Sequence, residues 1–462
     1  MNPAIFREYD IRGIVATDLT VKVVGEIGKA YGTFVQRHGA KQVSVGCDVR
    51  LTSSGLKAAV IEGITSTGVN VIDIGTVPTP VLYFSIAHFN TDGGLMVTGS
   101  HNPIEYNGLK MNLGMSSVYG GQIQEMRKLI GSNDLETGSG SVQKRDVLPE
   151  YRKMLDSKFD FERKLKIIID PGNGTAGPFT KSFFTEKGFD VECIFCEPDG
   201  NFPNHLPDPT VLKYIQPLRE KVVDEGADLG VGYDGDSDRV GIIDNLGRPV
   251  FADRLLAVIA RDMLSRNPGA KVLFDVKCSQ SLPEQIEKYG GVPMMWKTGH
   301  ALLKAKMREE KAPLAGEMSG HIFCSENYYG FDDAIYASAL LLRILSESDK
   351  TFAQIVDEIP AFYSTPEIRV TCAEEEKFRI VAELVEYFKS KYDVIDVDGV
   401  RALFGDGWGL VRASNTQPVL VLRFEAKTED KLKKIMGIFA GKLAEYPSVE
   451  KLNPDEIQIV KG

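Results

Sequence analysis

A candidate nucleophile lies in residues 98–103, which read TGSHNP and follow a short apolar run. Ser100 stands between Gly99 and His101, at the end of an expected strand, where backbone N–H groups suit an anionic group on its hydroxyl. The hydrolase pattern GxSxG does not fit, because Thr and Asn occupy its outer positions. A plain turn is the alternative, since Gly, Ser, Asn and Pro all favour turns. Lys110 follows on the next expected strand, near enough to serve the same site.

Three carboxylates alternate in residues 234–239, which read DGDSDR. In an extended loop Asp234, Asp236 and Asp238 point the same way, and they repel one another unless a cation lies among them. Oxygen ligands favour a hard ion, most simply Mg²⁺, whose usual further partner is a phosphate. An EF-hand is excluded, because the sixth position of its pattern is Arg and the twelfth is Asn, where Gly and Glu are required. The loop therefore predicts a magnesium site rather than a solvated acidic turn.

Two more polar loops follow expected strands. Residues 316–321, GEMSGH, alternate Glu317, Ser319 and His321, whose carboxylate, hydroxyl and imidazole can hydrogen-bond sugar hydroxyls. Residues 412–418, RASNTQP, combine a guanidinium with short hydroxyl and amide groups and could cradle a phosphate. A capping turn and a plain turn before a strand are the alternatives for these two loops, and the loop residues alone do not decide.

A glycine pattern at residues 172–177, GNGTAG, matches the dinucleotide fingerprint GxGxxG, and Glu192 follows Gly172 by 20 residues. In a true fingerprint the helix opens within the glycine loop. Here Pro178 follows the third glycine and predicts that the helix begins after the loop. Glu192 also lies near the start of the next expected strand rather than at its end. The pattern is therefore interpreted as structural, with no nucleotide cofactor.

Short apolar runs closed by Gly, Asp or Pro predict buried strands of α/β units, with helical patterns between them. One strand that ends in a polar loop occurs three times, as KQVSVGCDVR, KLKIIIDPGNG and AKVLFDVKCS. Its aspartates, Asp48, Asp170 and Asp275, are spaced by 122 and 105 residues. A second strand that leads into one of the first three polar loops follows each copy. Because ligands bind at such strand ends in open α/β sheets, the three loops could line one cleft.

The predicted fold class is α/β, with three topologically similar α/β domains that have mixed sheets and a smaller C-terminal α+β domain, around a central cleft. The repeat does not return after about residue 360, where residues 374–387 and 428–443 have the pattern of amphipathic helices and 419–424 that of a strand. The predicted domains are 1–147 with the serine loop, 148–249 with the metal-binding loop, 250–361 with the sugar-binding loop and 362–462 with the phosphate-binding loop.

The composition excludes several classes of protein. The 462 residues suggest about three domains, and 43% hydrophobic and 26% charged residues are ordinary for a globular protein. The net charge of −10 repels nucleic acid and anionic membranes, so neither is an expected partner. We expect no membrane helix and no signal peptide, because no apolar run is long enough and the first ten residues have no cleavage pattern.

The six cysteines are scattered, which favours a reducing cytoplasm over a disulfide framework. Cys193 and Cys196 form one CxxC pair within an expected strand. Side chains alternate between the two faces of a strand, so we expect these two sulfurs to diverge and to have no metal or redox role.

The chain closely resembles the α-D-phosphohexomutase superfamily, in its bacterial phosphomannomutase/phosphoglucomutase branch. The resemblance is carried by FREYDIRG at residues 6–13 and by the loops TGSHNP, DGDSDR, GEMSGH and RASNTQP in this order. The resemblance covers essentially the whole chain. It implies four domains around a cleft and interconversion of hexose 1-phosphates and 6-phosphates of mannose and/or glucose. A phosphoserine and a hexose 1,6-bisphosphate intermediate that turns over in the cleft would carry the reaction. It also implies phosphosugar partners, a role in supplying nucleotide sugars and polysaccharides, a monomer and a cytoplasmic location.

The resemblance also assigns roles to residues. Ser100 would be the phosphoserine, and its oxygen would join Asp234, Asp236 and Asp238 in binding Mg²⁺. The groups for proton transfer or charge stabilisation near the serine would be Arg12, Lys110 and His300, and which group is the general base stays open. The groups that face the substrate or line the cleft would be Tyr9, His101, Arg239, Lys277 and His321.

Glu317 and Ser319 would hold the sugar 3- and 4-hydroxyls. The configuration at C2 would then be recognised only weakly, so that both glucose and mannose could be substrates. Arg412, Ser414, Asn415 and Thr416 would clamp the phosphate that is not transferred. These four residues lie in the fourth domain, so hinge motion between the third and fourth domains is expected. His205 also lies in a family loop and is interpreted as structural.

Three rival functions differ from this one by sequence features. The phosphoglucosamine mutase branch typically has Gly at the positions of Ser237 and Asn415, so both residues favour the hexose branch. A metal-dependent phosphatase would release phosphate to water and need no clamp. A non-enzymatic sugar-phosphate-binding scaffold would be expected to lose Ser100 or one of the three aspartates, and this chain keeps all four.

Overall fold

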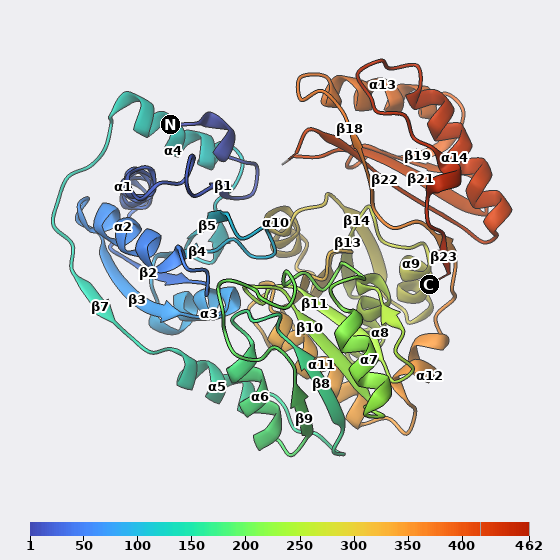
Figure 1. The fold of residues 1–462 in the computed structure, drawn as a ribbon, viewed down its shortest axis with the longest axis horizontal. Helices are drawn as coiled ribbons and strands as arrows, with labels where there is room; N and C mark the ends of the chain where they lie inside the picture. Colours follow the sequence, from blue (N-terminus) through green and yellow to red (C-terminus); the bar gives the residue numbers. More distant parts are fainter. Residues whose placement is uncertain (416, 462) are drawn as a thin grey trace.

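The computed structural model describes residues 1–415 and 417–461, and the chain forms four sheets, each in its own part of the sequence. Figure 1 shows the N-terminal domain at the left in blue, the second and third domains along the lower half in green to orange, and the C-terminal domain at the upper right in red. The predicted class, three α/β domains with mixed sheets and a C-terminal α+β domain, is confirmed. No helix of the described residues is both long and apolar enough to cross a membrane.

One strand pattern recurs in the first three sheets. A first strand pairs in parallel with two neighbours, and one of these pairs antiparallel with a returning strand. In the order neighbour, first, second and returning strand, the copies are β3 (Asn70–Thr76), β2 (Gln42–Cys47), β4 (Gly93–Val97) and β5 (Tyr106–Leu113); β9 (Asp190–Cys193), β8 (Lys166–Asp170), β10 (Leu229–Tyr233) and β11 (Val240–Asp244); and β14 (Val292–Trp296), β13 (Lys271–Asp275), β15 (Leu314–Gly316) and β16 (Ile322–Cys324). The repeat expected from the sequence is therefore present in the fold.

The repeat determines where the polar loops lie. The serine, aspartate and glutamate loops each connect the second strand of a copy to its returning strand. Each repeat aspartate, at or just after the end of a first strand, accepts a hydrogen bond from a loop N–H: Asp48 from Gly99 at 2.9 Å, Asp170 from Gly172 at 2.9 Å and Asp275 from Met318 at 3.2 Å. In the first and third copies this bond anchors a loop with proposed chemistry directly to the sheet.

Helices cover the sheets of these three domains. The helix α1 begins after Thr20, whose side chain accepts a hydrogen bond from the backbone of Val23. The helices are α1 (Val21–Arg37), α2 (Ser53–Thr65), α3 (Thr79–Phe89), α4 (Gly121–Ser132), α5 (Leu148–Asp156), α6 (Gly177–Glu186), α7 (Gln216–Asp224), α8 (Ala252–Arg266), α9 (Ser281–Lys288), α10 (His300–Glu310), α11 (Ala334–Ser346) and α12 (Phe352–Asp357). Four short strands complete the sheets: β1 (Ile11–Ile14), β6 (Ser116–Ser117), β7 (Val142–Lys144) and β12 (Pro249–Val250).

One apolar core joins the first three domains. It runs from Ile72 in β3 through Phe183 in α6 and Ile259 in α8 to Ile359, and all four side chains are buried. Burial of apolar surface is the main favourable term in folding, so a core that crosses domain boundaries makes these domains one frame.

The C-terminal domain has its own core and an antiparallel sheet. Its strands are β17 (Tyr363–Ser364), β18 (Ile368–Thr371), β19 (Asp393–Ile395), β20 (Val400–Leu403), β21 (Gly407–Ala413), β22 (Val419–Ala426) and β23 (Val460–Lys461), and its helices are α13 (Lys377–Lys389) and α14 (Glu429–Leu443). The helix α13 begins three residues later than the sequence pattern suggests, after a turn that ends at Glu376.

A small apolar cluster built around Val276, Trp408 and Leu410 links this domain to the third domain, together with several polar contacts. Arg401 of β20 lies fully buried beside this cluster, with its guanidinium 3.6 Å from the centre of the Trp408 ring. Arg401 donates to the carbonyls of Val276 and Cys278 at 2.8 and 2.7 Å, and burial lowers its pKa to about 10. The junction thus depends on a few polar contacts, unlike the shared core of the other three domains.

The expectation that Cys193 and Cys196 diverge is wrong, because a disulfide joins them. The strand β9 ends at Cys193, earlier than the apolar run suggests, and Phe195 adopts a left-handed backbone with φ 50°. That residue turns the chain back, so the strand alternation behind the expectation no longer applies.

Arg401→Met should weaken the attachment of the C-terminal domain, because two buried carbonyls lose their donors. We expect a loss of roughly 2–4 kcal/mol in the free energy of unfolding of that domain. Calorimetry should show part of the unfolding transition at lower temperature. Arg379→Met, an exposed arginine of α13, is the control and should change stability by less than about 0.5 kcal/mol; an equal effect of both substitutions would contradict this account.

Candidate active site

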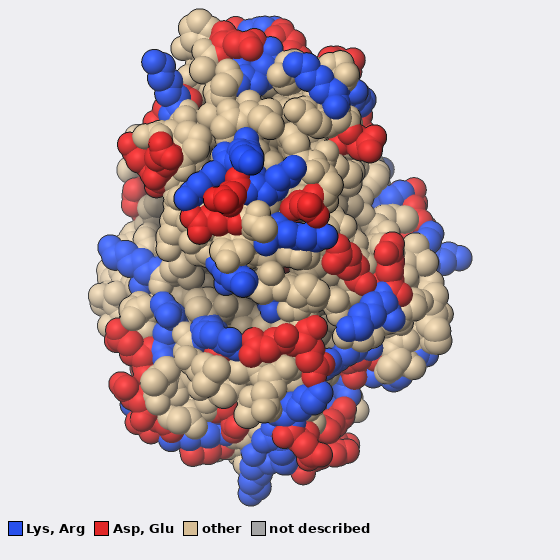
Figure 2. All heavy atoms as spheres, turned by 90° about the vertical axis from the view of Figure 1, so that its right-hand side faces the viewer, with Lys and Arg blue, Asp and Glu red and all other residues tan. Residues whose placement is uncertain are grey.

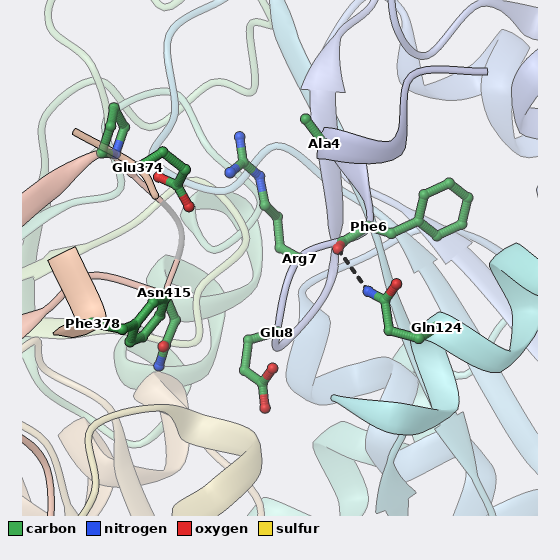
Figure 3. Close-up of a pocket in the computed structure, with 9 residues that line it drawn as sticks. Ala4, Phe6, Arg7, Glu8, Gln124, Glu374, Phe378 and Asn415 are labelled. Atoms are coloured by element: carbon green, nitrogen blue, oxygen red, sulfur yellow. Dashed lines mark hydrogen bonds between the residues drawn. The ribbon is translucent and has the colours of Figure 1, made fainter. Parts of the chain in front are cut away.

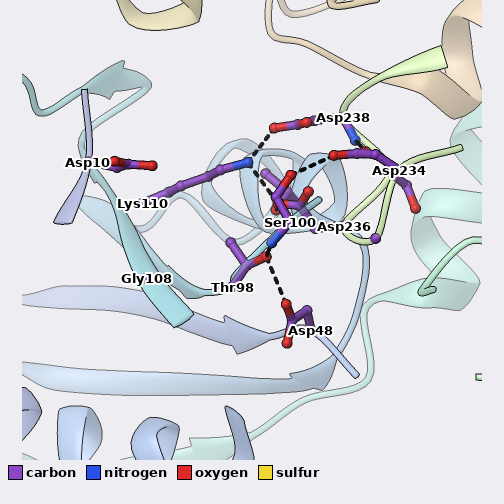
Figure 4. A network of polar contacts seen from close by, with 12 residues as sticks. Asp10, Asp48, Thr98, Ser100, Gly108, Lys110, Asp234, Asp236 and Asp238 are labelled. Atoms are coloured by element: carbon purple, nitrogen blue, oxygen red, sulfur yellow. Dashed lines mark hydrogen bonds and ion pairs between the residues drawn. The ribbon is translucent and has the colours of Figure 1, made fainter. Parts of the chain in front are cut away.

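Ser100 and Asp234 bring two of the predicted loops into contact. The serine Oγ donates to Asp234 Oδ2 at 2.6 Å (Figure 4). It also lies 3.0 Å from His101 Nδ1. Ser100 is buried and has φ 48°, a left-handed conformation that is uncommon outside glycine. The hydroxyl of Thr98 accepts from the Ser100 N–H at 2.9 Å and supports this turn. Such strained residues cluster at functional sites.

Arg50 shapes the serine loop and was missed in the sequence analysis. Its guanidinium donates to the carbonyls of Ser100 at 2.9 Å, Asn102 at 2.5 Å and Pro103 at 2.7 Å. Position 99 must be glycine, because a Cβ there would overlap Arg50 Nε. The available signal was the place of Arg50 two residues after the repeat aspartate, in CDVR.

Arg12 reaches the same loop from β1. Its Nη1 donates to Asn102 Oδ1 at 2.9 Å, and its Nη2 pairs with Asp10 at 2.6 Å. His101 lies 3.4 Å from Arg239 Nη1 across the site. Burial, and then the charge of Arg239, lower the pKa of His101 well below its usual value, so the ring is neutral at pH 7. Three arginines, Arg12, Arg50 and Arg239, therefore contact the serine loop, and the histidine of the loop is neutral.

The three aspartates are completely buried and close together, as the sequence predicts. Burial, and then repulsion by Asp236 and Asp238, raise the pKa of Asp234 well above its usual value. Lys110 Nζ lies 2.7 Å from Asp236 and also contacts Asp238. Burial alone would lower the pKa of Lys110, but the charges of the aspartates outweigh burial and raise it. Thr79 of α3 donates to Asp236 at 2.6 Å and was not expected.

This group fits a hard divalent cation. Asp236 Oδ1 and Asp238 Oδ1 are buried and have no hydrogen-bond partner among residues 1–415 and 417–461. Buried carboxylate oxygens are costly without a partner, and oxygen atoms are the ligands that Mg²⁺ prefers. The three carboxylates come from one loop, and Ser100 Oγ lies beside them, as the predicted ligand set requires.

Two histidines and a buried aspartate form the next part of the site. His321 Nδ1 lies 3.1 Å from Asp332 Oδ2, and His321 Nε2 accepts from Arg239 Nε at 3.0 Å. His300 stacks on His321 and lies 3.6 Å from Asp332. Burial, and then the charge of Lys304, lower the pKa of His300 well below its usual value. Asp332 and Lys304, joined at 2.9 Å, carried no motif that could have identified them.

The predicted sugar-binding loop lies next to the histidines. Glu317 is buried and accepts from the N–H of Gly299 at 2.5 Å, while Ser319 is half-buried in the same loop. Burial raises the pKa of Glu317 above its usual value. Lys277, two residues after β13, pairs at 2.9 Å with Glu367, which precedes β18 in the C-terminal domain. These residues border the junction between the third and fourth domains.

Three domains meet around Tyr9. Its hydroxyl donates to the Thr298 carbonyl at 2.8 Å and accepts from Asn415 Nδ2 at 2.5 Å. Arg412, on β21, donates from Nε to Asp398 at 2.8 Å, and Asp398 also accepts from the Thr298 N–H at 3.0 Å. The predicted phosphate-binding loop therefore faces the His300 loop of the third domain.

The remaining two members of the predicted clamp are Ser414 and Thr416. Ser414 follows β21, is buried and accepts from the N–H of Gln417 at 3.1 Å. Thr416 lies outside the described residues.

A hollow of about 490 Å³ separates the N-terminal segment from the C-terminal domain. Arg7, Glu8 and Gln124 lie on one side, and Glu374 and Asn415 on the other (Figure 3). It borders the clamp loop but includes neither the serine nor the aspartates, so it lies at the rim of the site.

The glycine pattern at residues 172–177 is used for packing, as the sequence analysis expects. The helix α6 begins at Gly177, the last residue of the pattern, and not after the loop as the sequence analysis expects. Gly174 packs on Gly235 of the aspartate loop, where a Cβ would overlap backbone. His205, interpreted as structural, bonds to Asp170 at 3.1 Å.

Comparisons with known proteins agree with this architecture. Sequence profiles of phosphoglucomutase/phosphomannomutase match alpha/beta/alpha domain I at residues 3–132, domain II at 149–247, domain III at 251–363 and the C-terminal domain at 367–442. The phosphomannomutase/phosphoglucomutase of Pseudomonas aeruginosa is 46% identical over 95% of both chains. The phosphoglucomutase of Neisseria gonorrhoeae is 40% identical over 96% of this chain and 97% of its own.

A solved structure of a phosphoglucomutase/phosphomannomutase family protein from Burkholderia thailandensis is 39% identical and superimposes with a TM-score of 0.92, covering 98% of this chain and 100% of its own. Fold and site together define an isomerase of the phosphohexomutase class. The chain belongs to the phosphoglucomutase/phosphomannomutase family.

The substitution Arg50→Lys tests whether the hydrogen bonds of Arg50 position the serine loop. Lysine keeps the charge but cannot donate to the carbonyls of Ser100, Asn102 and Pro103 in one plane. We expect about 100-fold lower kcat/KM, because small misplacements of a reacting group are costly. Mn²⁺ binding, measured by titration calorimetry, should change less than twofold. Arg37→Lys, an exposed arginine of α1, is the control; unchanged kcat/KM in Arg50→Lys would contradict this positioning role.

Proposed function

We propose that the protein interconverts hexose 1-phosphates and hexose 6-phosphates, of glucose and/or mannose, through phosphorylated Ser100 and a hexose 1,6-bisphosphate. The observation that carries the proposal is the 2.6 Å contact of Ser100 Oγ with Asp234 inside a buried group of three carboxylates. The names of the relatives from Pseudomonas aeruginosa and Neisseria gonorrhoeae support the same activity.

In the proposed reaction the phosphoryl group passes from Ser100 Oγ to a sugar hydroxyl, and after the bisphosphate turns, the other phosphoryl group returns to Ser100. Phosphoryl transfer needs positioning and charge neutralisation. Mg²⁺ bound by Asp234, Asp236, Asp238 and a phosphoserine oxygen would neutralise charge on the transferring group. Lys110 supplies a further cation at the same point, and its contact with Asp236 supports that role.

We assign proton transfer to His321, which the sequence analysis placed among the substrate-facing groups, rather than to Arg12, Lys110 or His300. Its Nδ1 lies beside the Asp332 carboxylate, so Nδ1 carries the proton and Nε2 carries the lone pair that accepts from Arg239. In our proposal a sugar hydroxyl replaces the Arg239 N–H at Nε2 and gives up its proton there. His300, Arg12 and Arg239 stabilise charge around the phosphoryl group, and His101, Tyr9 and Lys277 line the substrate.

Two orientations of the intermediate require recognition that tolerates reversal of the sugar. Glu317 and Ser319 would bind the 3- and 4-hydroxyls in both orientations. Arg412, Ser414, Asn415 and Thr416 would hold the phosphate that is not reacting. The narrow junction of the C-terminal domain, with the Lys277–Glu367 pair beside it, supports hinge motion while the intermediate turns.

The partners in this proposal are phosphosugars alone, and the protein acts as a monomer. Lys and Arg alternate with Asp and Glu over the face in Figure 2, without the continuous basic surface that nucleic acid or an anionic membrane would need. We propose a cytoplasmic location, because charged hexose phosphates do not cross a bilayer unaided.

Phosphoglucosamine mutase is the alternative activity. Asn415 bonds to Tyr9, and a glycine at that position would lose this interdomain contact. Ser237 bonds to Thr175 at 2.9 Å and serves packing, so it says less about the sugar than the sequence suggested.

Ser100→Ala should lower mutase activity by about 1000-fold or more, because no other group can carry the phosphoryl. A coupled assay with glucose, mannose and glucosamine 1-phosphates, with Mg²⁺ and with EDTA, measures this together with the sugar preference and metal dependence. Ser85→Ala, which removes a buried hydroxyl of α3, is the control. Near-normal turnover by Ser100→Ala would contradict the phosphoserine, and preference for the amino sugar would favour the alternative.

Arg412→Ala should weaken phosphosugar binding and spare phosphorylation of Ser100. Loss of a charge-assisted hydrogen bond to phosphate corresponds to a roughly 10- to 100-fold higher KM. Steady-state kinetics and mass spectrometry of the phosphorylated protein measure the two effects. The control is Arg379→Ala on α13; an unchanged KM in Arg412→Ala would argue against the clamp.

A further inference from the structure

The Cys193–Cys196 disulfide has no role in the proposed reaction. A short series of hydrogen bonds nevertheless connects it to the metal-binding loop. Ile194, between the cysteines, still continues the parallel ladder by donating to the Ile169 carbonyl at 2.9 Å. Phe195 then takes the left-handed conformation, which costs a bulky residue energy. The disulfide is the covalent link that holds the chain folded back across this residue.

The turn held by the disulfide supports the glycine loop at residues 172–177. The N–H of Asn173 donates to the Phe195 carbonyl at 2.9 Å, and its side chain donates to the Glu197 carbonyl at 2.8 Å. Gly177, at the start of α6, packs directly on the backbone of Cys196, where a Cβ would overlap the carbonyl oxygen. A shift of residues 195–197 must therefore move the glycine loop.

The glycine loop in turn supports the aspartate loop. The N–H of Thr175 donates to the Gly235 carbonyl at 3.1 Å, and its hydroxyl lies 2.9 Å from the Ser237 hydroxyl. Gly235 and Ser237 alternate with the three aspartates in sequence. Two sets of contacts thus connect the disulfide to the backbone that aims the carboxylates.

We propose that Cys193 and Cys196 form a reversible thiol–disulfide site. Its reduction loosens the glycine loop, and with it the metal-binding loop, and so lowers the mutase activity. The effect on turnover rests on the proposed function, whereas the thiol chemistry and the loosening of the loop do not. The reductant is a dithiol, of the kind found in small molecules or in thioredoxin-like proteins.

The exchange balances as an ordinary thiol–disulfide reaction. A thiolate of the dithiol attacks one sulfur, the Cys193–Cys196 bond breaks, and a mixed disulfide forms. The second thiol of the reductant then closes its own disulfide and releases the second cysteine. The protein gains two electrons and two protons, which the dithiol loses.

The site is chemically selective within this chain. Cys193 and Cys196 are only partly buried, whereas the four free cysteines are buried, namely Cys47, Cys278, Cys324 and Cys372. Acidic residues flank the pair in sequence at positions 190, 192, 197 and 199. These charges repel an anionic thiol such as glutathione more than a neutral dithiol such as dithiothreitol.

The test compares oxidised and reduced protein. Wild-type protein, oxidised with diamide and then reduced with dithiothreitol, glutathione or thioredoxin, is assayed for kcat/KM. It is also examined by hydrogen exchange of residues 172–177 and 234–239. Reduction should lower kcat/KM two- to tenfold and speed exchange in both segments at least threefold, and reoxidation should restore both. Dithiothreitol and thioredoxin should react faster than glutathione.

The Cys193→Ser/Cys196→Ser double variant should behave as the reduced protein and ignore dithiols. Cys372→Ser, which removes a buried thiol in the C-terminal domain, is the matched control and should keep the response. Alkylation with mass spectrometry reports the disulfide itself.

Three results would overturn the proposal: failure of the disulfide to form under oxidation, equal hydrogen exchange in both states, or a dithiol effect that persists in the double variant. If hydrogen exchange responds while no mutase activity exists in either state, the proposed function fails and the redox site stands.

Discussion

The buried negative charge of Asp234, Asp236 and Asp238 is the constraint on which the rest of the structure depends. Three carboxylates in one loop repel one another, and burial raises the pKa of Asp234 further. The loop is stable only where donors and cations surround it. The donors come from another domain: Ser100, Thr79 and Lys110 all bond to the aspartates. Satisfying the charge of one domain therefore holds two domains together.

The repeated α/β unit explains how four loops can meet while the molecule still moves. Three copies present the same connection, and one shared core fixes them as a frame around the serine, the aspartates and His321. The C-terminal domain is attached differently, through a small apolar cluster and polar contacts such as those of the buried Arg401 and the Lys277–Glu367 pair. A rigid frame suits phosphoryl transfer, which depends on positioning, and a fourth domain with its own core suits the reorientation of the intermediate that we propose.

The parts that the sequence predicted are those encoded by local pattern. The three-copy repeat marked by Asp48, Asp170 and Asp275 predicts three similar α/β units with polar loops at strand ends, because a strand followed by a polar loop is a local signal. Arg50 and Asp332 were missed, because their importance comes from partners about fifty and eleven residues away that no spacing rule relates to them. Cys193 and Cys196 were misjudged, since periodicity assumes a regular strand and Phe195 ends it.

The sequence by itself determined the fold class, the four polar loops and the chemistry of the aspartates, because residue type and alternation decide which atoms a loop can offer. Only the tertiary structure decided which loops touch, which cation balances which carboxylate and where His321 obtains its orienting partner. Those outcomes depend on distances of a few ångströms between segments far apart in the chain. Electrostatic and hydrogen-bond energies change steeply over such distances, so no local pattern could fix them.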